Sequence, residues 1–235
     1  MKTLATRYTS SLILAVLGVC SLGAAQAQTQ SQPAASQPAA TSEQQTVATG
    51  DALAPGQIFA NPVMSVRSPN EAGWKMGVQT SVALSFVKPG VNPREDYAAQ
   101  VMLFPIKDNL SKDEFVAYIK KGIDANSPPD RFKPIESKLT YTTQRGYPCV
   151  QFAGVTEDMK SASTGGGSTK LQVRSLYCHH PQDQGVGFMI AFMHRGENLD
   201  KGLPAKAEEF FKGAKAVVVS HEAAPAAKQS APSSK

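Results

Sequence analysis

Two cysteines, Cys149 and Cys178, are the residues of this chain whose chemistry is most readily predicted. They lie in two strand-like runs, 147–156 and 170–179, and a hairpin with its tip near Gly165 places them directly opposite each other. Opposed residues of a non-hydrogen-bonded antiparallel pair have Cα atoms about 4.5 Å apart, which a disulfide tolerates. We expect a structural disulfide, whose closed loop would stabilise the fold by about 3 kcal/mol. A redox-active pair is the alternative, but the sequence has no Cys-x-x-Cys motif to support it.

Three histidines near the second cysteine could bind a metal or assist a nucleophile. If 170–179 and 186–194 pair across a turn, His179 faces a residue near 188, and His194 lies roughly 20 Å further along the strand. His179 and His180 also point to opposite faces of a strand. We therefore expect a polar pair beside a turn, with a polar functional site at His179 and His180 as the alternative.

Four methionines, Met76, Met102, Met189 and Met193, could suggest a thioether copper site. Methionine more commonly fills irregular space in a core, and residues 186–194 are apolar at nearly every position, which indicates a strand buried on both faces. Core packing is therefore the prediction, and no metal site is expected.

The run of three glycines at 165–167 superficially resembles a phosphate loop, but it lacks the lysine and the strand-to-helix context of one. We interpret it as a hairpin tip within the loop 157–169, where a binding surface could be presented. The candidate residues of this interaction loop are Met159, Ser161, Thr164, Gly165, Gly166 and Gly167.

No catalytic constellation can be assembled from the remaining polar residues. Three acids, Asp124, Glu157 and Asp158, have no partner that the sequence can place. Three serines, at positions 161, 163 and 168, have no histidine at a definable distance. The sequence predicts no catalytic residue, no cofactor-binding residue, no cofactor and no metal ligand.

Strands must position nearly all of these residues. Period-two alternation or apolar runs typical of strands occur at 74–79, 81–86, 96–106, 135–144, 147–156, 170–179 and 186–194, and 217–219 is a candidate for a short final strand. The run 96–106 is apolar on both faces, which predicts a central strand.

Two amphipathic helices complete the pattern. Ser111 and Glu114 form a capping box at the start of a helix that ends near Ala125, before Ser127-Pro128-Pro129. A second helix begins near Pro204, a residue suited to a first turn.

Strands joined by short turns are antiparallel, and two amphipathic helices can cover them. We predict an α+β fold, in which one antiparallel sheet of six to seven strands packs with two helices as an α/β/α sandwich. The segments 97–101, 111–115, 178–181 and 208–211 resemble the PsbP-like and DcrB-like superfamily of such sandwiches. That resemblance covers roughly residues 70–218 and implies an accessory role in binding or scaffolding other proteins.

The first 27 residues have the features of a secretory signal peptide: basic Lys2 and Arg7, an apolar run at 12–22, and a small-residue cleavage site ending at Ala27. The alternative is lipoprotein processing at Cys20, although Val19 is large for that pattern. We expect a periplasmic or secreted mature protein with no membrane span.

The mature chain carries a mild charge. Cleavage removes two basic residues and no acid, so the net charge falls from +5 to +3, with 22 basic residues against 19 acidic ones. The basic residues are scattered, which argues against nucleic acid or anionic membrane as a partner. Residues 28–55 and 220–235 are rich in Gln, Pro, Ala and Ser and are expected to be disordered tails around a globular domain at 56–219.

Taken as a whole, the sequence predicts an exported, non-enzymatic accessory or binding protein of the bacterial envelope, with another envelope protein as its partner. Two alternatives stay open. One is a hydrolytic or small-ligand enzyme whose site is assembled from distant residues. The other is a cell-wall-associated protein that uses its Pro/Ala-rich tails.

Overall fold

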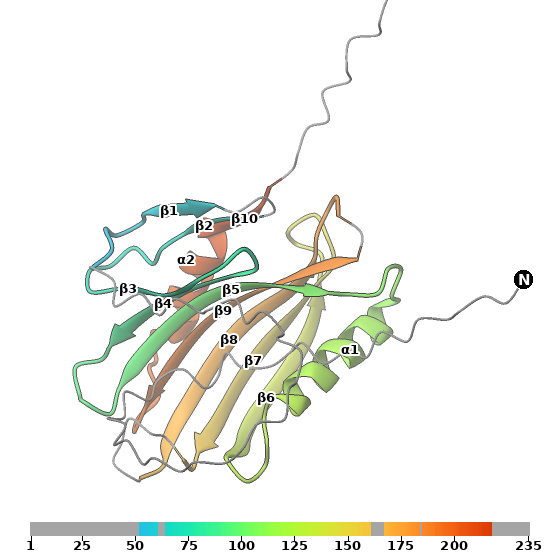
Figure 1. The fold of residues 1–235 in the computed structure, drawn as a ribbon. Helices are drawn as coiled ribbons and strands as arrows, with labels where there is room; N and C mark the ends of the chain where they lie inside the picture. The colour runs from blue at the N-terminus through green and yellow to red at the C-terminus, as the bar shows by residue number, and fades with distance from the viewer. Residues whose placement is uncertain (1–51, 61–63, 161–166, 184, 218–235) are drawn as a thin grey trace, which may run out of the picture.

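The computed structural model of the chain describes residues 52–60, 64–160, 167–183 and 185–217. These residues form ten strands and two helices, whose arrangement can be followed in Figure 1. In chain order they are β1 (Ile58–Ala60), β2 (Met64–Arg67), β3 (Lys75–Gln79), β4 (Ala83–Pro89), β5 (Asp96–Pro105), α1 (Lys112–Ala125), β6 (Phe132–Thr142), β7 (Cys149–Asp158), β8 (Thr169–His179), β9 (Val186–Gly196), α2 (Leu203–Gly213) and β10 (Ala214–Ala216).

Seven of these strands form one curved antiparallel sheet in the order β3-β4-β5-β9-β8-β7-β6. Strand β9 is in the middle and is buried along almost its whole length, as the apolar run at 186–194 predicts. Strand β5, predicted to be central, is an interior strand next to β9. The predicted α+β class, with a seven-stranded sheet and two helices, is confirmed.

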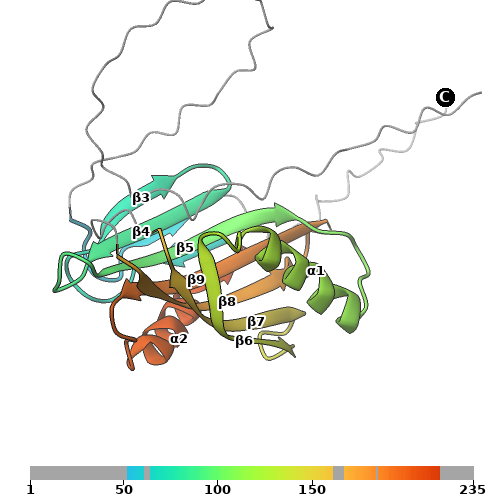
Figure 2. The same ribbon diagram turned by 90° about the horizontal axis from the view of Figure 1, so that it is seen from below.

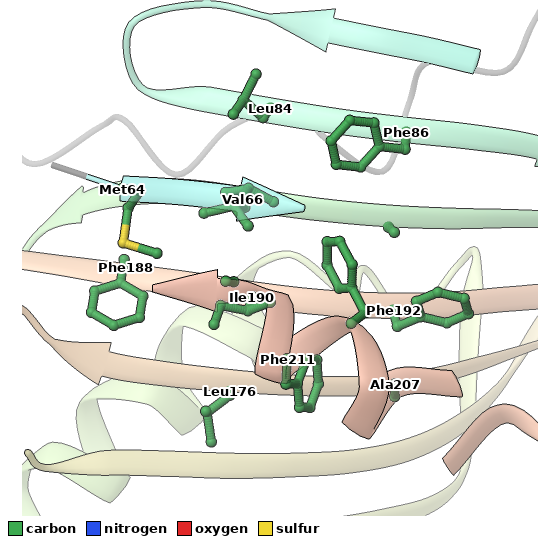
Figure 3. Packing of buried hydrophobic residues seen from close by; sticks show 14 of the residues in the cluster. Met64, Val66, Leu84, Phe86, Leu176, Phe188, Ile190, Phe192, Ala207 and Phe211 are labelled. Carbon is green, nitrogen blue, oxygen red and sulfur yellow. The ribbon is translucent and has the colours of Figure 1, made fainter. Parts of the chain in front are cut away.

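The two helices lie on opposite faces of this sheet (Figure 2). Alternate residues of a strand point to opposite faces, so β9 contributes Phe188, Ile190 and Phe192 to one side and Met189 to the other. Figure 3 shows these first three side chains gathered with Phe211 of α2. The main core therefore lies between α2 and the sheet.

Helix α1 begins at the predicted capping box. The Glu114 amide donates to the Ser111 hydroxyl, and the Ser111 amide donates to the Glu114 carboxylate. Phe115 and Ile119 are the fully buried residues of the helix, and they pack against one end of the sheet. The rest of α1 extends over β6 and β7 (Figure 1).

A second, small sheet was not predicted. Strand β2 pairs with β1 on one side and with β10 on the other, and it packs Met64 and Val66 into the main core (Figure 3). The final strand begins directly after α2, at Ala214, and residues 218 and 219 of the predicted strand lie outside the described part. Within the described residues, Ala52 pairs with Lys75 in an isolated bridge, and Ala52 lies inside the segment 28–55 that is predicted to be a linker.

Neither of the two helices in the described residues is long and apolar enough to cross a membrane.

Candidate binding groove

The face of the large sheet that carries α1 contains a groove of about 150 Å³, which we call the α1 groove. Its floor is built from side chains on one face of three neighbouring strands. These are Met102 and Gln100 of β5, Met189, Ala191 and Met193 of β9, and Tyr177, Ser175, Val173 and Leu171 of β8.

Strand register explains why this floor is hollow. Ala191 lies opposite both Gln100 and Ser175, so two small side chains are adjacent in the middle of the floor. On β7, the ring of Phe152 lies against Gly154, where even a Cβ atom would be only 2.4 Å from it. Small residues in the middle with larger ones at both ends leave a depression that the sheet itself cannot fill.

The C-terminal half of α1 forms the wall of the groove, with Gly122, Ile123, Asn126 and Ser127 lining it. Gly122 lies inside the helix, where glycine costs about 1 kcal/mol relative to alanine. The absence of a side chain at this position leaves space between the helix and the floor.

Three methionines, Met102, Met189 and Met193, line the groove, whereas Met76 packs in the core on the α2 side. Met189 and Met193 are both buried, as the prediction of core packing requires. The sequence did not predict that they also line a groove. Flexible thioether side chains adapt to differently shaped apolar ligands, which suits such a surface.

The groove also contains a buried hydroxyl. Ser175 is fully buried, and its hydroxyl lies beside the Tyr177 phenol on the same face of β8. Burial raises the pKa of the Tyr177 phenol, and a hydrogen bond with Ser175 opposes part of that increase.

The two ends of the groove differ in polarity. At the end near Met189, the floor meets the apolar cluster of Phe104, Phe115 and Ile119 beneath α1. At the other end, β9 and β7 carry charged residues on the same face of the sheet. Arg195 follows Met193 by two positions on β9, and Asp158 follows Thr156 by two positions on β7.

The charged end is a network of ion pairs. Arg131 donates from Nε and Nη2 to the two oxygens of Asp158, at 3.0 and 3.1 Å. Arg195 lies 3.5 Å from Asp158 and 3.6 Å from Asp96. Burial raises the pKa of the Asp96 carboxyl, and the Arg195 charge opposes that increase. The Arg131 guanidinium also covers the ring of Phe132, at the mouth of the groove, with 4.8 Å to its centroid.

The predicted cysteine pair lies on the α2 side of the sheet. Cys149 and Cys178 are directly opposite each other in the β7–β8 hairpin, as the sequence register predicts, and their sulfur atoms form a disulfide with the Cα atoms 4.1 Å apart. Both residues are fully buried and belong to the main core. This position suits a structural bond and not an exchanging one.

The structure places the predicted histidines apart. The His179 ring contacts Phe115 under α1, and its burial lowers its pKa. His180 is buried beside the β8–β9 turn, where its Nδ1 accepts from the amides of Gln182 and Asp183. Neither ring lines the groove.

The third histidine belongs to a separate polar cluster on the α2 side. His194 Nε2 lies 2.8 Å from Glu95 Oε1, and the imidazole packs in a tilted arrangement against the Tyr97 ring, with 4.6 Å between the ring centroids. Tyr97 donates to Asp200, which also accepts from Lys206 at 2.9 Å. Within the described residues, no group of three or more His, Cys, Asp or Glu side chains is arranged to hold a metal ion.

Of the proposed interaction loop, Met159 and Gly167 are described, and Ser161, Thr164, Gly165 and Gly166 lie outside the described residues. Met159 is exposed. Neither it nor Gly167 borders the α1 groove.

Sequence reasoning missed the partners of two acids and most of the groove. Asp158, treated as an isolated acid, is held by Arg131 and Arg195, and Asp124 pairs with Lys120 one helical turn away. The one available signal was the β6–β7 hairpin, in which Phe132, the residue after Arg131, lies opposite Asp158. The groove depends on a register across three strands, which no local pattern reveals.

These features define an antiparallel α/β/α sandwich with an open apolar groove on one face. No protein-family model matches the chain, and no curated protein matches its sequence. Among solved structures, the chain is similar to LpqN of Mycobacterium tuberculosis, described as involved in cell envelope biogenesis, with 14% identity and a TM-score of 0.43 over 69% of this chain and 90% of that one.

A structure from Bacteroides thetaiotaomicron VPI-5482 is also similar, with 14% identity and a TM-score of 0.39 over 70% of this chain and 49% of the other. At this level of similarity neither protein transfers a function or a residue role. Neither description names the PsbP-like and DcrB-like superfamily, so that resemblance stays a prediction from the sequence.

Proposed function

We propose that the protein is an exported, non-enzymatic binding protein of the bacterial envelope, and that the α1 groove holds its ligand. The observation that carries this proposal is the groove itself. It is a depression with an apolar floor and a buried hydroxyl at Ser175, and concave apolar surfaces with few polar groups are typical of ligand sites.

The surroundings of the groove favour binding over catalysis. The titratable groups at the charged end of the groove, including Asp158 and Arg131, form ion pairs with one another. A general acid or base must reach the reacting atoms, and the imidazoles of His179 and His180 lie elsewhere.

Two features support export. The predicted signal peptide at residues 1–27 directs the chain out of the cytoplasm. The Cys149–Cys178 disulfide suits an oxidising compartment, where such bonds form and persist. The intact mass of the protein purified from the envelope tests this directly, since a chain beginning at Gln28 is expected and a lipid-modified chain beginning at Cys20 would contradict the soluble form.

Binding at the groove can be tested with an apolar fluorescent dye, N-phenyl-1-naphthylamine, titrated into the mature chain. We expect saturable binding that Gly122→Leu weakens at least tenfold, because the new side chain fills the space between α1 and the floor. Leucine is a better helix former than glycine, so the fold should not lose stability. Lys121→Leu adds the same side chain at the neighbouring exposed position and should bind the dye normally.

The methionine methyl groups report the location of the ligand. With isotope-labelled methionine, the NMR signals of Met102, Met189 and Met193 should shift on dye binding, and those of Met64 and Met76 in the α2-side core should not. Absence of saturable binding, or equal binding by both leucine variants, would show that the groove is not a ligand site.

A further inference from the structure

We infer that two copies of the chain associate through β6, which pairs antiparallel with β6 of the second copy about a two-fold axis at Ser137. Strand β6 forms one margin of the large sheet (Figure 1). Apart from Phe132, none of its residues lines the α1 groove, so this surface is separate from the proposed ligand site. Four features of β6 select the partner and the register: its open edge, the direction of its backbone groups, its length and its charges.

Strand β6 is the open one of the two edges of the large sheet. Strand β3, at the other edge, has only five residues and a bulge, and Ala52 pairs with Lys75 from outside. Strand β6 has eleven residues, and no strand among the described residues pairs with its outer side. Residues 133–138 are all exposed, including Ile135 with 58% of its surface accessible. A long exposed edge is a template to which a strand of another chain can add.

The backbone N–H and C=O groups of Ser137 point away from the sheet. The Cα atoms of Cys149 and Cys178 are 4.1 Å apart, as in a non-hydrogen-bonded pair, so the backbone groups of Cys149 point away from β8 and toward the opposite residue of β6, Thr142. This direction alternates along a strand, so the even-numbered residues of 136–142 bond to β7 and the odd-numbered ones point outward. Ser137 can therefore exchange two hydrogen bonds with Ser137 of the second copy.

The length of β6 favours the same axis. Ser137 is the central residue of the strand, so a two-fold axis there brings nearly the whole length of both strands together. An axis at Leu139, the next outward-pointing residue, would pair only residues 136–142 and leave the start of each strand without a partner. The bulge after Pro134 gives each strand one extra residue, and it lies outside residues 136–138 around the axis.

The charges select a second copy as the partner. Glu136 and Lys138 flank Ser137 and lie on the same face of the strand, because alternate residues do. Both are exposed, and neither forms an ion pair within the described residues. The axis at Ser137 places each Glu136 opposite Lys138 of the other copy, which gives two matched pairs. An axis at Leu139 would place Lys138 opposite Thr140 and leave both charges unmatched.

The expected dimer is weak and reversible. One pair of strand edges buries less surface than a standard protein interface, which places the dimer among transient assemblies. At the low protein concentration of a denaturation experiment the chain is therefore monomeric. A substitution at Glu136 then acts on association and not on the stability of the monomer.

Charge reversal tests the pairing in the mature chain, with sedimentation equilibrium over a concentration series as the measurement. The parent protein should show a monomer–dimer equilibrium. Glu136→Lys and Lys138→Glu should each raise the dimer Kd by about tenfold or more, because like charges then face each other twice. Lys121→Glu makes the same change in net charge as Lys138→Glu at an exposed position of α1, and it should leave the Kd nearly unchanged.

A mixture of the two reversed variants restores the charge pattern. With Glu136→Lys in one copy and Lys138→Glu in the other, opposite charges face each other at both contacts, so the mixture should form a heterodimer with a Kd close to that of the parent. The double variant that carries both substitutions should recover association as well. These recoveries also show that the variants are folded, so the loss of the dimer in each single variant is not a failure to fold.

Cysteine crosslinking tests the position of the axis. Opposed residues of a hydrogen-bonded antiparallel pair have Cα atoms about 5.5 Å apart, which a disulfide tolerates. Ser137→Cys should therefore form a disulfide between two copies under mild oxidation. Thr140→Cys is also exposed, but its two copies would lie about 20 Å apart along the strands and should not crosslink.

Three results would overturn the inference. The first is a parent protein that stays monomeric at every concentration. The second is a dimer whose Kd responds to neither charge reversal, or a mixture that does not recover association, because another surface would then hold the copies together. The third, crosslinking of Thr140→Cys in preference to Ser137→Cys, would overturn the assigned register. Dye binding enters none of these measurements, so the ligand site at the α1 groove is tested separately.

Discussion

The guanidinium of Arg131 holds both oxygens of the Asp158 carboxylate, and this carboxylate is fully buried where β7 ends. Arg195 approaches the same carboxylate from β9. The network connects the loop after α1 to the centre of the sheet at the polar end of the groove. A buried charge that loses its partner is costly, because the desolvation of the remaining charge is no longer offset.

Replacement of Asp158 by Asn should therefore destabilise the fold strongly. The substitution keeps the shape but leaves Arg131 and Arg195 without their shared negative charge, and breaking a buried pair in this way costs about 3–5 kcal/mol. The free energy of unfolding from urea denaturation measures the effect. Glu157→Gln changes the neighbouring acid on the opposite face of β7 and should stay within about 0.5 kcal/mol of the parent protein. Equal stability of the two variants would contradict a structural role for the network.

The disulfide predicts a second loss of stability. Replacing both Cys149 and Cys178 by Ala should lower the free energy of unfolding by about 3 kcal/mol, because the unfolded chain regains the freedom of the loop that the bond closes. In the parent protein, alkylation followed by mass spectrometry should modify these two thiols only after reduction under denaturing conditions. Modification of the folded, unreduced protein would show that the bond does not form.

The same hairpin shows how far the sequence could predict this structure. The β7–β8 register followed from two long strands and a polar loop, and the start of α1 followed from Ser111 and Glu114, since these signals are local. The small sheet was missed because β1, β2 and β10 have only three or four residues each, and β10 pairs with a strand far away in the sequence.

The groove was missed for a related reason. Its hollow arises where Ala191 meets Gln100 on one side and Ser175 on the other, and these three residues come from strands whose pairing order is not sequential. A small residue in an apolar strand looks the same whether it fills a tight core or leaves a depression. The ion pair of Arg131 with Asp158 likewise depends on a bulge in β6, between Pro134 and Glu136, that shifts the register.

The pair of Glu95 and His194 predicts how stability depends on pH. The hydrogen bond from His194 is the main cause that holds the pKa of the Glu95 carboxyl below its ordinary value of 4.5. A group with a lowered pKa in the folded state stabilises the protein above the unfolded-state pKa, and this contribution is lost as the pH falls through the lower, folded-state value. The stability advantage of the parent protein over Glu95→Gln should therefore be full near neutral pH and should shrink as the pH falls below 4.5.

Urea denaturation of both proteins across this pH range measures the difference. Glu136→Gln, at an exposed position on the edge strand β6, is the matched control and should differ from the parent by a small amount at every pH. A difference between the parent and Glu95→Gln that is independent of pH down to acid unfolding would contradict the proposed linkage.

Arg145 predicts a final effect, at the end of α2. The last carbonyl groups of a helix have no partner within the helix and carry partial negative charge. The Arg145 guanidinium donates from Nη1 to the Phe211 carbonyl at 2.9 Å and from Nη2 to the Ala214 carbonyl, and its Nε donates to the Tyr147 hydroxyl. It thereby connects the loop before β7 to the point where α2 passes directly into β10.

Because hydrogen bonds to charged groups contribute about 1.5–3 kcal/mol, Arg145→Ala should lower the free energy of unfolding by about that amount. Arg145→Lys should recover only part of the loss, since a lysine cannot donate to three acceptors in the planar geometry of a guanidinium. Gln144→Ala, at the exposed neighbouring position, should leave stability almost unchanged in the same urea titration. Full recovery by lysine would show that the charge alone, and not the geometry of the guanidinium, stabilises the end of α2.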